Sequence, residues 1–530
     1  MIGADHVAAV ERAYELIEAA QGELSSGEVD AAADRIGRAD RWDVQVLLHF
    51  ARSLAVRESG GDDAPHVRAM LDVAQALDDP ALHALALAVT AARRADARPS
   101  LSVGLDESPG GPLVRAVGLL DEAGGSPVVH RVAALIEVAT VAHAMGFWEL
   151  ALELYERTDE VLADDPLWAS TIRRQRVVLA VNRVELVLDW ASAEALIGDW
   201  DAASARAAQV TGRAETTGWP AGWVRQYDGY LRLLGVLADV HGRASNAHTR
   251  AESVTKLEAG SDAYSSLCTA IRATRDGDLA RAAVAAGGLA ERFGLAAPPN
   301  TRLLAMQLAA RDPRCPEAAA RFAGELVWLR WKERLLRMAN MREAIKGERR
   351  RREHEQLRRE IVTDDLTGLA NRRGFHAYLT ERRDAETGSR DADAHAAVRD
   401  YAVMMIDVDR FKQVNDMFGH EVGDRVLARV AGILGAAVRH GDLAARLGGD
   451  EFAVILAGVR PDVARARAEA VLEAVRGHRW DELAPGLAVE VSIGLHHGSH
   501  RELPELLGDA DRNLYAAKHD GRGRVAEKIH

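Results

Sequence analysis

Two adjacent carboxylates follow a pair of glycines in residues 448–452, between two apolar stretches. Residues 443–447 can form a short strand and residues 452–456 are rich in strand-forming types, so we expect a β-hairpin with Gly448-Gly449 as its turn. Glycine at a turn also lets a ligand approach the backbone closely. An ordinary hairpin with solvated acids would show the same local pattern. The chemistry of this acidic pair therefore depends on what lies beside it.

A second acidic group ends the strand-like run 401–409. Alternation places Val403, Met405, Asp407 and Asp409 on one face, which begins apolar and ends in two carboxylates. Burying unpaired carboxylates is costly, so a cation or another partner is expected at this end of the strand. Mg²⁺ and Mn²⁺ prefer oxygen ligands. A strand and a hairpin that both carry acids therefore favour a two-metal site for phosphoryl transfer.

These segments and several others resemble the GGDEF family of diguanylate cyclases, and they occur in the family's order. Residues 362–530 carry the resemblance, which says nothing about the rest of the chain. It implies a nucleotidyl-cyclase-like α/β domain, with a mainly antiparallel central sheet flanked by helices. The matching segments are Asp-Asp-Leu-Thr-Gly-Leu at 364–369, Asp-Val-Asp-Arg-Phe at 407–411, Phe-Gly-His-Glu at 418–421, Arg-Leu-Gly-Gly-Asp-Glu-Phe at 446–452, and the C-terminal stretches 491–495 and 510–518.

The activity that this resemblance implies is the condensation of two GTP into cyclic di-GMP, with release of two pyrophosphates. Asp407, Asp450 and Glu451 match the catalytic acids of the family. With the backbone carbonyl of Val408 they would hold two Mg²⁺ or Mn²⁺ ions per GTP. Asp450 is also expected to help remove the proton of the attacking 3′-hydroxyl. Asp409 is left out of this set, because a helix cap or a partner of a ligand explains it equally well.

The resemblance also implies contacts with the substrate, and each has a structural alternative. Asp424 could instead be the N-cap of the helix expected after it. The C-terminal cations, Lys518 and Arg522, could instead be solvated residues at the end of the last helix. The residues implied are Asn415 and Asp424 for guanine, Lys518 and Arg522 for phosphates, and the backbone amides around Arg410 and Phe411 for the β and γ phosphates.

An Arg-x-x-Asp pattern lies shortly before the signature, at Arg439 and Asp442. In the family this spacing marks an allosteric site for the product, cyclic di-GMP. Arginine can bind a phosphate or a guanine edge with two hydrogen bonds, and the carboxylate can accept guanine N–H groups. The alternative is a surface ion pair at a helix end. We expect product inhibition through this pair.

Length and charge fit a regulated protein of several domains. The chain has 530 residues, which exceeds what one core usually supports. Its formal net charge of −13 argues against nucleic acid as a partner. We find no run of 18 apolar residues and no secretory signal, so we expect a cytoplasmic protein without a membrane segment.

Residues 1–325 have helical periodicity and few alternating stretches. A motif of Gly, any residue, an apolar residue, two variable residues and Ala recurs at 27–32, 146–151, 198–203 and 277–282. It resembles the turn and second helix of tetratricopeptide repeats, although the spacing is irregular. We expect an α-solenoid that binds a protein, a peptide or a small effector, with an all-helical sensor bundle as the alternative.

Residues 326–361 are expected to form a connecting helix or a short coiled coil between this region and the domain at 362–530. Each active site of the family holds one GTP, so synthesis requires a homodimer with two facing domains. We hypothesise that the helical region senses a signal and changes how the two domains face each other. The competing interpretation is a catalytically inactive domain that serves as a receptor for GTP or cyclic di-GMP.

Overall fold

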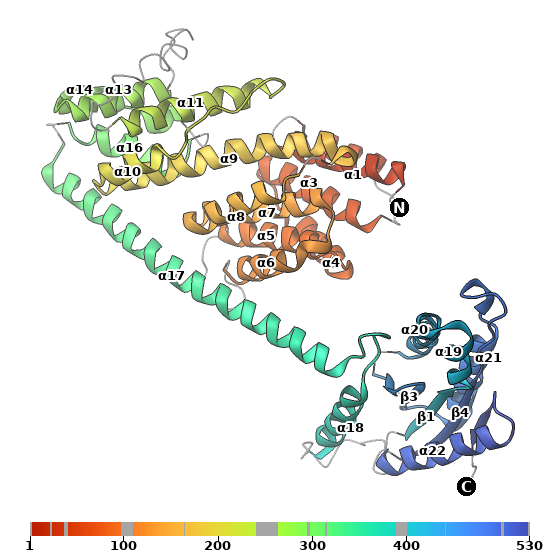
Figure 1. The fold of residues 1–530 in the computed structure, drawn as a ribbon. Coiled ribbons are helices and arrows are strands. Elements are labelled where there is room, and N and C mark those ends of the chain that lie inside the picture. Colours follow the sequence, from red (N-terminus) through yellow and green to blue (C-terminus); the bar gives the residue numbers. More distant parts are fainter. Residues whose placement is uncertain are drawn as a thin grey trace. The chain divides into compact units, whose positions relative to one another are not determined.

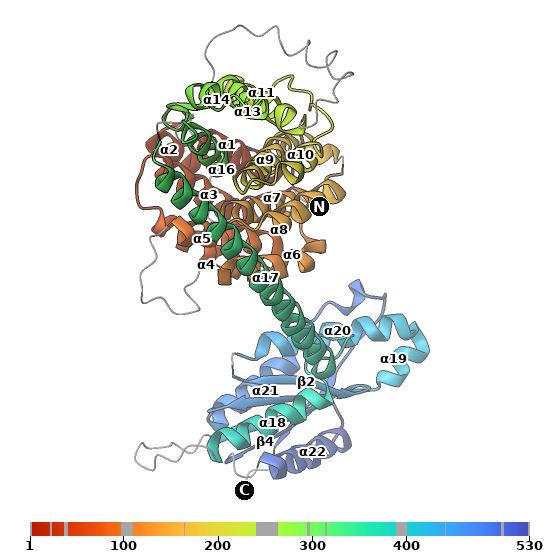
Figure 2. The same cartoon turned by 90° about the vertical axis from the view of Figure 1, so that its left-hand side faces the viewer.

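The computed structural model describes residues 3–21, 24–36, 41–96, 110–163, 165–239, 263–293, 297–312, 315–387, 400–439, 441–499 and 503–527. The chain divides into two compact units, Met1–Arg350 and Arg351–His530. The first consists of helices, and the second contains a sheet with helices packed on it, as Figure 1 and Figure 2 show. The expected fold class is confirmed in outline, as a helical N-terminal region followed by a C-terminal domain with a sheet.

The described part of the first unit is built of helices that mostly pack on their neighbours in the chain, as α3 does on α4 and α7 on α8. Short polar or glycine-containing turns join many of them. The helices are α1 (Ala4–Ala19), α2 (Ser26–Ile36), α3 (Trp42–Glu58), α4 (Ala64–Ala76), α5 (Pro80–Asp96), α6 (Gly110–Glu122), α7 (Val128–Ala144), α8 (Trp148–Val161), α9 (Ala169–Leu196), α10 (Trp200–Ala207), α11 (Ala221–Ala238), α13 (Ala263–Arg275), α14 (Leu279–Ala286), α15 (Leu289–Phe293), α16 (Pro299–Ala309) and α17 (Glu317–Val362).

The recurring glycine motif marks turns between paired helices in three of its four copies. Gly146, Gly198 and Gly277 precede α8, α10 and α14, with φ angles of 81°, 87° and 77° that favour glycine. The first copy differs, because Gly27 lies inside α2. These turns establish helix pairs. A tetratricopeptide-type solenoid stays a prediction, because paired helices alone do not establish a regular repeat.

The described residues of the first unit form two hydrophobic cores, and α9 belongs to both. Ile172, Leu179 and Leu186 pack with residues of α1 to α8. Leu188 and Ala195, in the second half of α9, pack with residues of α11, α13 and α16. This 28-residue helix therefore joins the two halves of the unit.

Helix α17 contains the whole segment expected to connect the two regions. Trp331 packs against the first core of the helical unit, and Met338, Met341 and Ile345 are buried in it. The spacing of these residues is that of one helix face. Trp328, one turn earlier in α17, is 44% exposed.

The second unit is a five-stranded mixed sheet in the order β2-β3-β1-β4-β5. Neighbouring strands are antiparallel except β4 and β5, which are parallel. The elements are α18 (Arg372–Thr387), β1 (Asp400–Val408), α19 (Phe411–Phe418), α20 (His420–Ala437), β2 (Leu443–Gly448), β3 (Glu451–Ala457), α21 (Pro461–Arg476), β4 (Val491–Ser499), α22 (Leu503–His519) and β5 (Val525–Glu527).

Helices cover both faces of this sheet, and the alternation along β1 assigns each residue to one face. Met404 and Ile406 belong to the core that includes residues of α20 and α21. Val403 and Met405 belong to the core that includes residues of α18 and α22. Helix α22 lies very close to β4, because a Cβ on Gly494 would meet the Ala510 carbonyl oxygen at 2.1 Å. Glycine is therefore required at this position.

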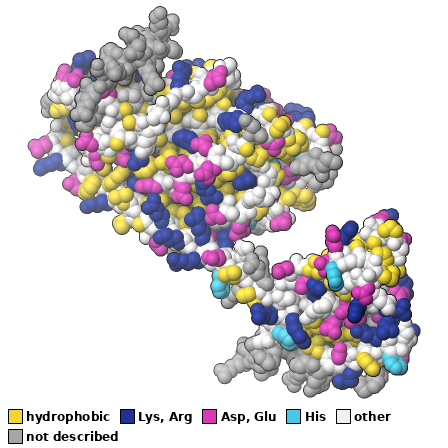
Figure 3. Space-filling view, in the orientation of Figure 1, with side chains coloured by type: hydrophobic (Ala, Val, Ile, Leu, Met, Phe, Trp, Pro, Cys, Tyr) yellow, Lys and Arg dark blue, Asp and Glu magenta, His cyan; other side chains and the backbone are white. Residues whose placement is uncertain are grey.

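The described surface of the helical unit carries both signs of charge. On the face drawn in Figure 3, Lys and Arg are interspersed with Asp and Glu. Within the described ranges, no helix has an apolar stretch long enough to cross a membrane.

Candidate functional site

The acidic hairpin forms as expected, but its turn lies one residue further along the chain. Gly448 and Glu451 are register partners, so the two turn residues are Gly449 and Asp450 rather than Gly448-Gly449. Gly449 has φ of 56°, and Gly448, at the end of β2, has φ of 149°. Both values favour glycine. The shift places one acid in the turn and the other at the start of β3.

The end of β1 lies directly beside this hairpin. Asp407 is the register partner of Glu451, and the Val408 amide donates a hydrogen bond of 3.2 Å to the Asp450 carbonyl. Asp407 is buried, with 7% of its surface exposed, whereas Glu451 is exposed. The fold thus brings together the four residues that the sequence proposed as metal ligands.

The charge on Asp407 is partly balanced by a lysine from α22. The Lys518 Nζ lies 2.6 Å from its Oδ2. Burial raises the pKa of Asp407 above its ordinary value, and the negative charges of Asp450 and Asp409 raise it further, while Lys518 opposes the shift. Asp407, Asp450 and Glu451, which we call the acidic edge, thus carry more negative charge than Lys518 balances. An additional cation would stabilise this arrangement.

The described side chains at this site do not form a complete metal site on their own. Among the described residues, no three His, Cys, Asp or Glu side chains converge closely enough to hold an ion by themselves. Mg²⁺ often takes only one or two carboxylates from a protein and completes its shell with water and substrate phosphates. The donor set of Asp407, Asp450 and Glu451 fits that kind of site.

Asp409, which the sequence left undecided, has a structural role. Its carboxylate accepts hydrogen bonds from the Ser492 hydroxyl at 2.8 and 3.0 Å and from the Gly523 amide at 3.0 Å. Its own amide donates to the Glu490 carbonyl at 2.9 Å. Asp409 therefore fixes the end of β1 against β4 and the turn after α22. No local pattern in the sequence indicated these partners, because they lie more than 80 residues away.

The two C-terminal cations differ in environment. Lys518 is in the last turn of α22 and is paired with Asp407. Arg522 follows in the turn, with φ of 65°, and its side chain is 48% exposed. Its guanidinium Nε lies 3.9 Å from Asp409. Arg522 thus stays open to solvent beside the acidic edge.

The backbone around Arg410 and Phe411 turns sharply into α19. Arg410 has φ of 54°, a left-handed conformation that is uncommon for a residue with a side chain. It precedes the first residue of α19, so nearby backbone N–H groups lack partners within the helix. The turn therefore leaves amide donors at the start of α19, directly after the end of β1.

Asn415 and Asp424 lie on adjacent helices, α19 and α20. The Asn415 Oδ1 is buried and has no hydrogen-bond partner among the described residues. It packs against α20, because a Cβ on Gly423 would meet it at 1.9 Å. Asp424 is exposed and lies inside α20, whose N-cap is Gly419, so the N-cap alternative for Asp424 is wrong.

Arg439 and Asp442 form a pair with very different exposure. The Arg439 side chain is 59% exposed, whereas that of Asp442 is 1% exposed. Asp442 accepts hydrogen bonds from the Ala457 amide at 3.0 Å and from the Arg467 guanidinium at 3.1 Å. Its carboxylate thus fastens the start of β2 to β3 and α21.

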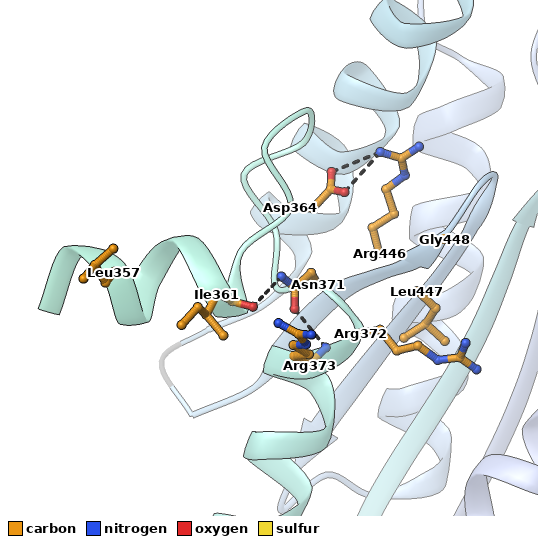
Figure 4. A pocket seen from close by; sticks show the side chains of 9 residues that line it. All are labelled: Leu357, Ile361, Asp364, Asn371, Arg372, Arg373, Arg446, Leu447 and Gly448. Atoms are coloured by element: carbon orange, nitrogen blue, oxygen red, sulfur yellow. Dashed lines mark hydrogen bonds and ion pairs between the residues drawn. The ribbon is translucent and has the colours of Figure 1, made fainter. Parts of the chain in front are cut away.

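Arg446, the first residue of the signature, links two motifs in a way the sequence did not reveal. Its guanidinium donates to the Gly449 carbonyl at 2.9 and 3.0 Å and to the Asp364 carboxylate at 3.1 and 3.2 Å, as the close view in Figure 4 shows for the carboxylate. These bonds hold the turn of the acidic hairpin. Leu357 and Ile361 of α17 line the same cleft of about 490 Å³ as Asp364 and Arg446, and Figure 4 shows this cleft from close by.

The comparison with protein families now identifies the second unit. Residues 361–524 match the family described as diguanylate cyclase, GGDEF domain. This part of the chain is a GGDEF domain. The expected resemblance is therefore confirmed for the residues that carry the acidic site.

Individual relatives of the GGDEF domain include two curated proteins and a solved structure. Diguanylate cyclase DgcM of Escherichia coli is 38% identical over 176 residues, which are 33% of this chain and 40% of that protein. Response regulator PleD of Caulobacter vibrioides is 40% identical over 177 residues, 32% of this chain and 36% of that protein. The coiled coil and GGDEF domain of DgcB from Caulobacter crescentus, in complex with c-di-GMP, is 31% identical, with 36% of this chain and 99% of that structure covered at a TM-score of 0.31.

The similarity to these curated relatives covers about a third of this chain. The chain spans two-fifths or less of the length of DgcM and PleD. Their names therefore bear on the GGDEF domain, and the function of the whole chain is a matter for proposal.

Proposed function

We propose that this protein is a diguanylate cyclase that condenses two GTP into cyclic di-GMP and releases two pyrophosphates. The observation that supports this best is the register of Asp407 with Glu451, which joins the acids of β1 and β3 at one edge of a GGDEF domain. The names of curated relatives support the same reaction.

The substrate contacts follow from the polar groups that surround this edge. The Asn415 Oδ1, without a partner among the described residues, can accept an N–H group of guanine, and the exposed Asp424 can accept another. Arg522 is open to solvent and can bind a phosphate with two hydrogen bonds. Lys518 supplies a second positive charge close to Asp407.

Asp407, Asp450, Glu451 and the Val408 carbonyl would hold the divalent cations, Mg²⁺ or Mn²⁺, with two ions per GTP. When bound, such ions neutralise the triphosphate and lower the pKa of the attacking 3′-hydroxyl. Asp450, which lies in the turn, would help to remove the proton of that hydroxyl. Arg446 holds this turn through its bonds to Gly449.

Catalysis by this proposal requires a homodimer, because two GTP must meet and each GGDEF domain would hold one. The helical region would bind a protein, a peptide or a small effector and act on catalysis through α17. Cyclic di-GMP would inhibit by binding at Arg439 and Asp442.

The test is a turnover assay with the full chain, GTP and Mg²⁺, with products separated by chromatography. We expect cyclic di-GMP and pyrophosphate in a 1:2 ratio. Glu451→Gln removes one acid from the metal-binding edge, so we expect a rate loss of at least about 100-fold. Glu469→Gln, on the exposed face of α21, is the matched control and should keep the rate.

The outcome also separates the proposed enzyme from the inactive receptor. GTP or cyclic di-GMP binding without any product, under conditions where the chain is folded, would contradict the cyclase and favour the receptor. Equal rates for Glu451→Gln and the unaltered chain would show that the acidic edge is not the active site.

A further inference from the structure

The helical unit contains a cavity that the proposed reaction does not use. Its volume is about 380 Å³, which lies in the range of sites for small molecules. The turn between α7 and α8, the C-terminal half of α9, the start of α16 and one face of α17 form its walls. Every lining residue belongs to the first unit.

One wall of the cavity is aromatic and is held rigidly. The rings of Trp148 and Trp331 lie 6.1 Å apart, and the Arg334 guanidinium lies 4.4 and 4.6 Å from their centroids. Arg334 also makes two hydrogen bonds, of 2.8 and 3.1 Å, to the Glu149 carboxylate. The two terminal nitrogens of Arg334 are thus paired with Glu149, while its buried Nε has no hydrogen-bond partner among the described residues. These bonds let Arg334 position the wall.

A buried donor in the same wall lacks a partner. Trp148 is 4% exposed, and its indole Nε1 makes no hydrogen bond among the described residues. A buried N–H group without an acceptor destabilises the folded state, so such groups usually mark a bound water or ligand. Trp148 lines the cavity, and an oxygen acceptor bound there would satisfy this N–H group.

The charges of the lining indicate how much negative charge that acceptor can carry. Arg330 lines the cavity and has no ion-pair partner among the described residues. Arg337, which also lines it, forms an ion pair with Glu333, with 3.9 Å between its Nε and the Glu333 Oε1. Asp189 also lines the cavity and is already satisfied by the amide and side chain of Asn300, at 2.9 and 3.0 Å. One unpaired cation beside two carboxylates favours a single negative charge over a doubly charged phosphate.

We propose that this cavity binds a small aromatic carboxylate. The carboxylate accepts hydrogen bonds from Arg330 and from the Trp148 indole, and the ring packs on Trp331. Such a ligand connects α17 to α8, α9 and α16. The regulatory consequence rests on the proposed cyclase activity, because α17 continues to Val362 at the start of the GGDEF domain; the binding itself does not.

Binding is tested on the full chain without GTP, by calorimetry and by the thermal unfolding midpoint. The probes are benzoate and indole-3-acetate, each paired with its uncharged amide, which keeps the ring and removes the charge. We expect saturable binding of at least one carboxylate and at least about tenfold weaker binding of its amide, as the loss of a charge-assisted hydrogen bond predicts.

Two substitutions locate the site. Arg330→Gln removes the unpaired charge from an exposed position, and Trp148→Phe removes the indole N–H while keeping a ring. Each should weaken carboxylate binding about tenfold. Arg321→Gln, also exposed on α17 and outside the cavity, should leave it unchanged. Trp148 is a core residue, so Trp148→Phe could fail to fold. In that case the result for Arg330→Gln alone tests the proposal.

Two outcomes would overturn the proposal. Equal affinity for a carboxylate and its amide would show that Arg330 does not bind the charge. If neither carboxylate bound, the acceptor at the Trp148 indole would be water and the cavity would not be a carboxylate site. Failure of this proposal is distinguishable from failure of the proposed function. A chain that makes cyclic di-GMP but binds no carboxylate contradicts only the cavity, and a chain that binds the carboxylate but makes no product contradicts only the cyclase.

Discussion

Asp442 and Arg439 are three residues apart, yet their exposure gives them different functions. Asp442 is buried and bonded to the Ala457 amide and to Arg467, so its removal would leave both donors unpaired. Arg439 points its guanidinium to the surface and touches the Ala457 carbonyl at 2.9 Å. Substituting both residues together would therefore mix a loss of product binding with a loss of folding.

Arg439→Ala alone is the sharper test of product inhibition. We expect the initial rate to stay within about twofold, because the exposed guanidinium lies outside the acidic edge. Progress curves should lose the early plateau that accumulating cyclic di-GMP causes. The measurement is a full time course, with and without added cyclic di-GMP.

The matched control for this experiment is Arg460→Ala, which removes a more exposed arginine from the same unit. Its time course should follow that of the unaltered chain. An unchanged plateau in Arg439→Ala would exclude this residue from an inhibitory site.

At the residue scale, the sequence predicted the positions of the acidic residues but not their hydrogen-bond partners. Strand alternation placed Asp407 at the end of β1, and the glycine pair indicated a turn beside Asp450 and Glu451. The bonds from Ser492 to Asp409 and from Arg446 to Asp364 join segments about 80 residues apart. Local periodicity carries no information about such pairs.

At the scale of elements, the junction between α17 and α18 is closely packed. The Asn371 side chain donates to the carbonyls of Ile361 and Thr363, at 2.8 and 2.9 Å, and accepts from the amide of Gly374 at 3.0 Å. A Cβ on Gly374 would lie 2.2 Å from the Val362 carbonyl oxygen. The end of α17 is thus fixed on the first turn of α18.

Gly374→Ala should disrupt this junction. Because backbone rather than a flexible side chain occupies the space, α18 has to shift, at a cost of roughly 1–3 kcal/mol. We expect faster amide hydrogen exchange along α18, measured by mass spectrometry. Gly432→Ala, an exposed position in α20 with no atom within 4 Å of the new Cβ, is the control and should slightly stabilise its helix. Equal exchange in both variants would contradict the tight packing.

The helices and strands were largely predictable, and the exceptions have physical reasons. Periodicity indicated the helices of the first unit, because each buries one face. The strands beside the acids are buried on both faces, and their strand-forming residues indicated them. The hairpin turn was misplaced by one residue, since two consecutive glycines permit several turn positions. The turns at Gly146, Gly198 and Gly277 explain why the motif resembled a repeat even though its spacing is irregular.

For the whole molecule, the proposed reaction makes a prediction about protein concentration. If two GGDEF domains must face each other, the rate per chain at saturating GTP should rise with protein concentration and then level off. Light scattering on the same samples should show dimers appearing over that range. A constant rate per chain in samples that contain only monomers would contradict a dimeric active form.

Helix α9 supplies residues to both cores of the helical unit, and this has a consequence for how that unit comes apart. Unfolding of either half of α9 would expose apolar side chains in the other half to solvent. Neither core can therefore unfold independently of the other. Heating or denaturant should therefore open the two halves in one concerted step, with a single midpoint shared by Trp168 in the first and Tyr230 in the second.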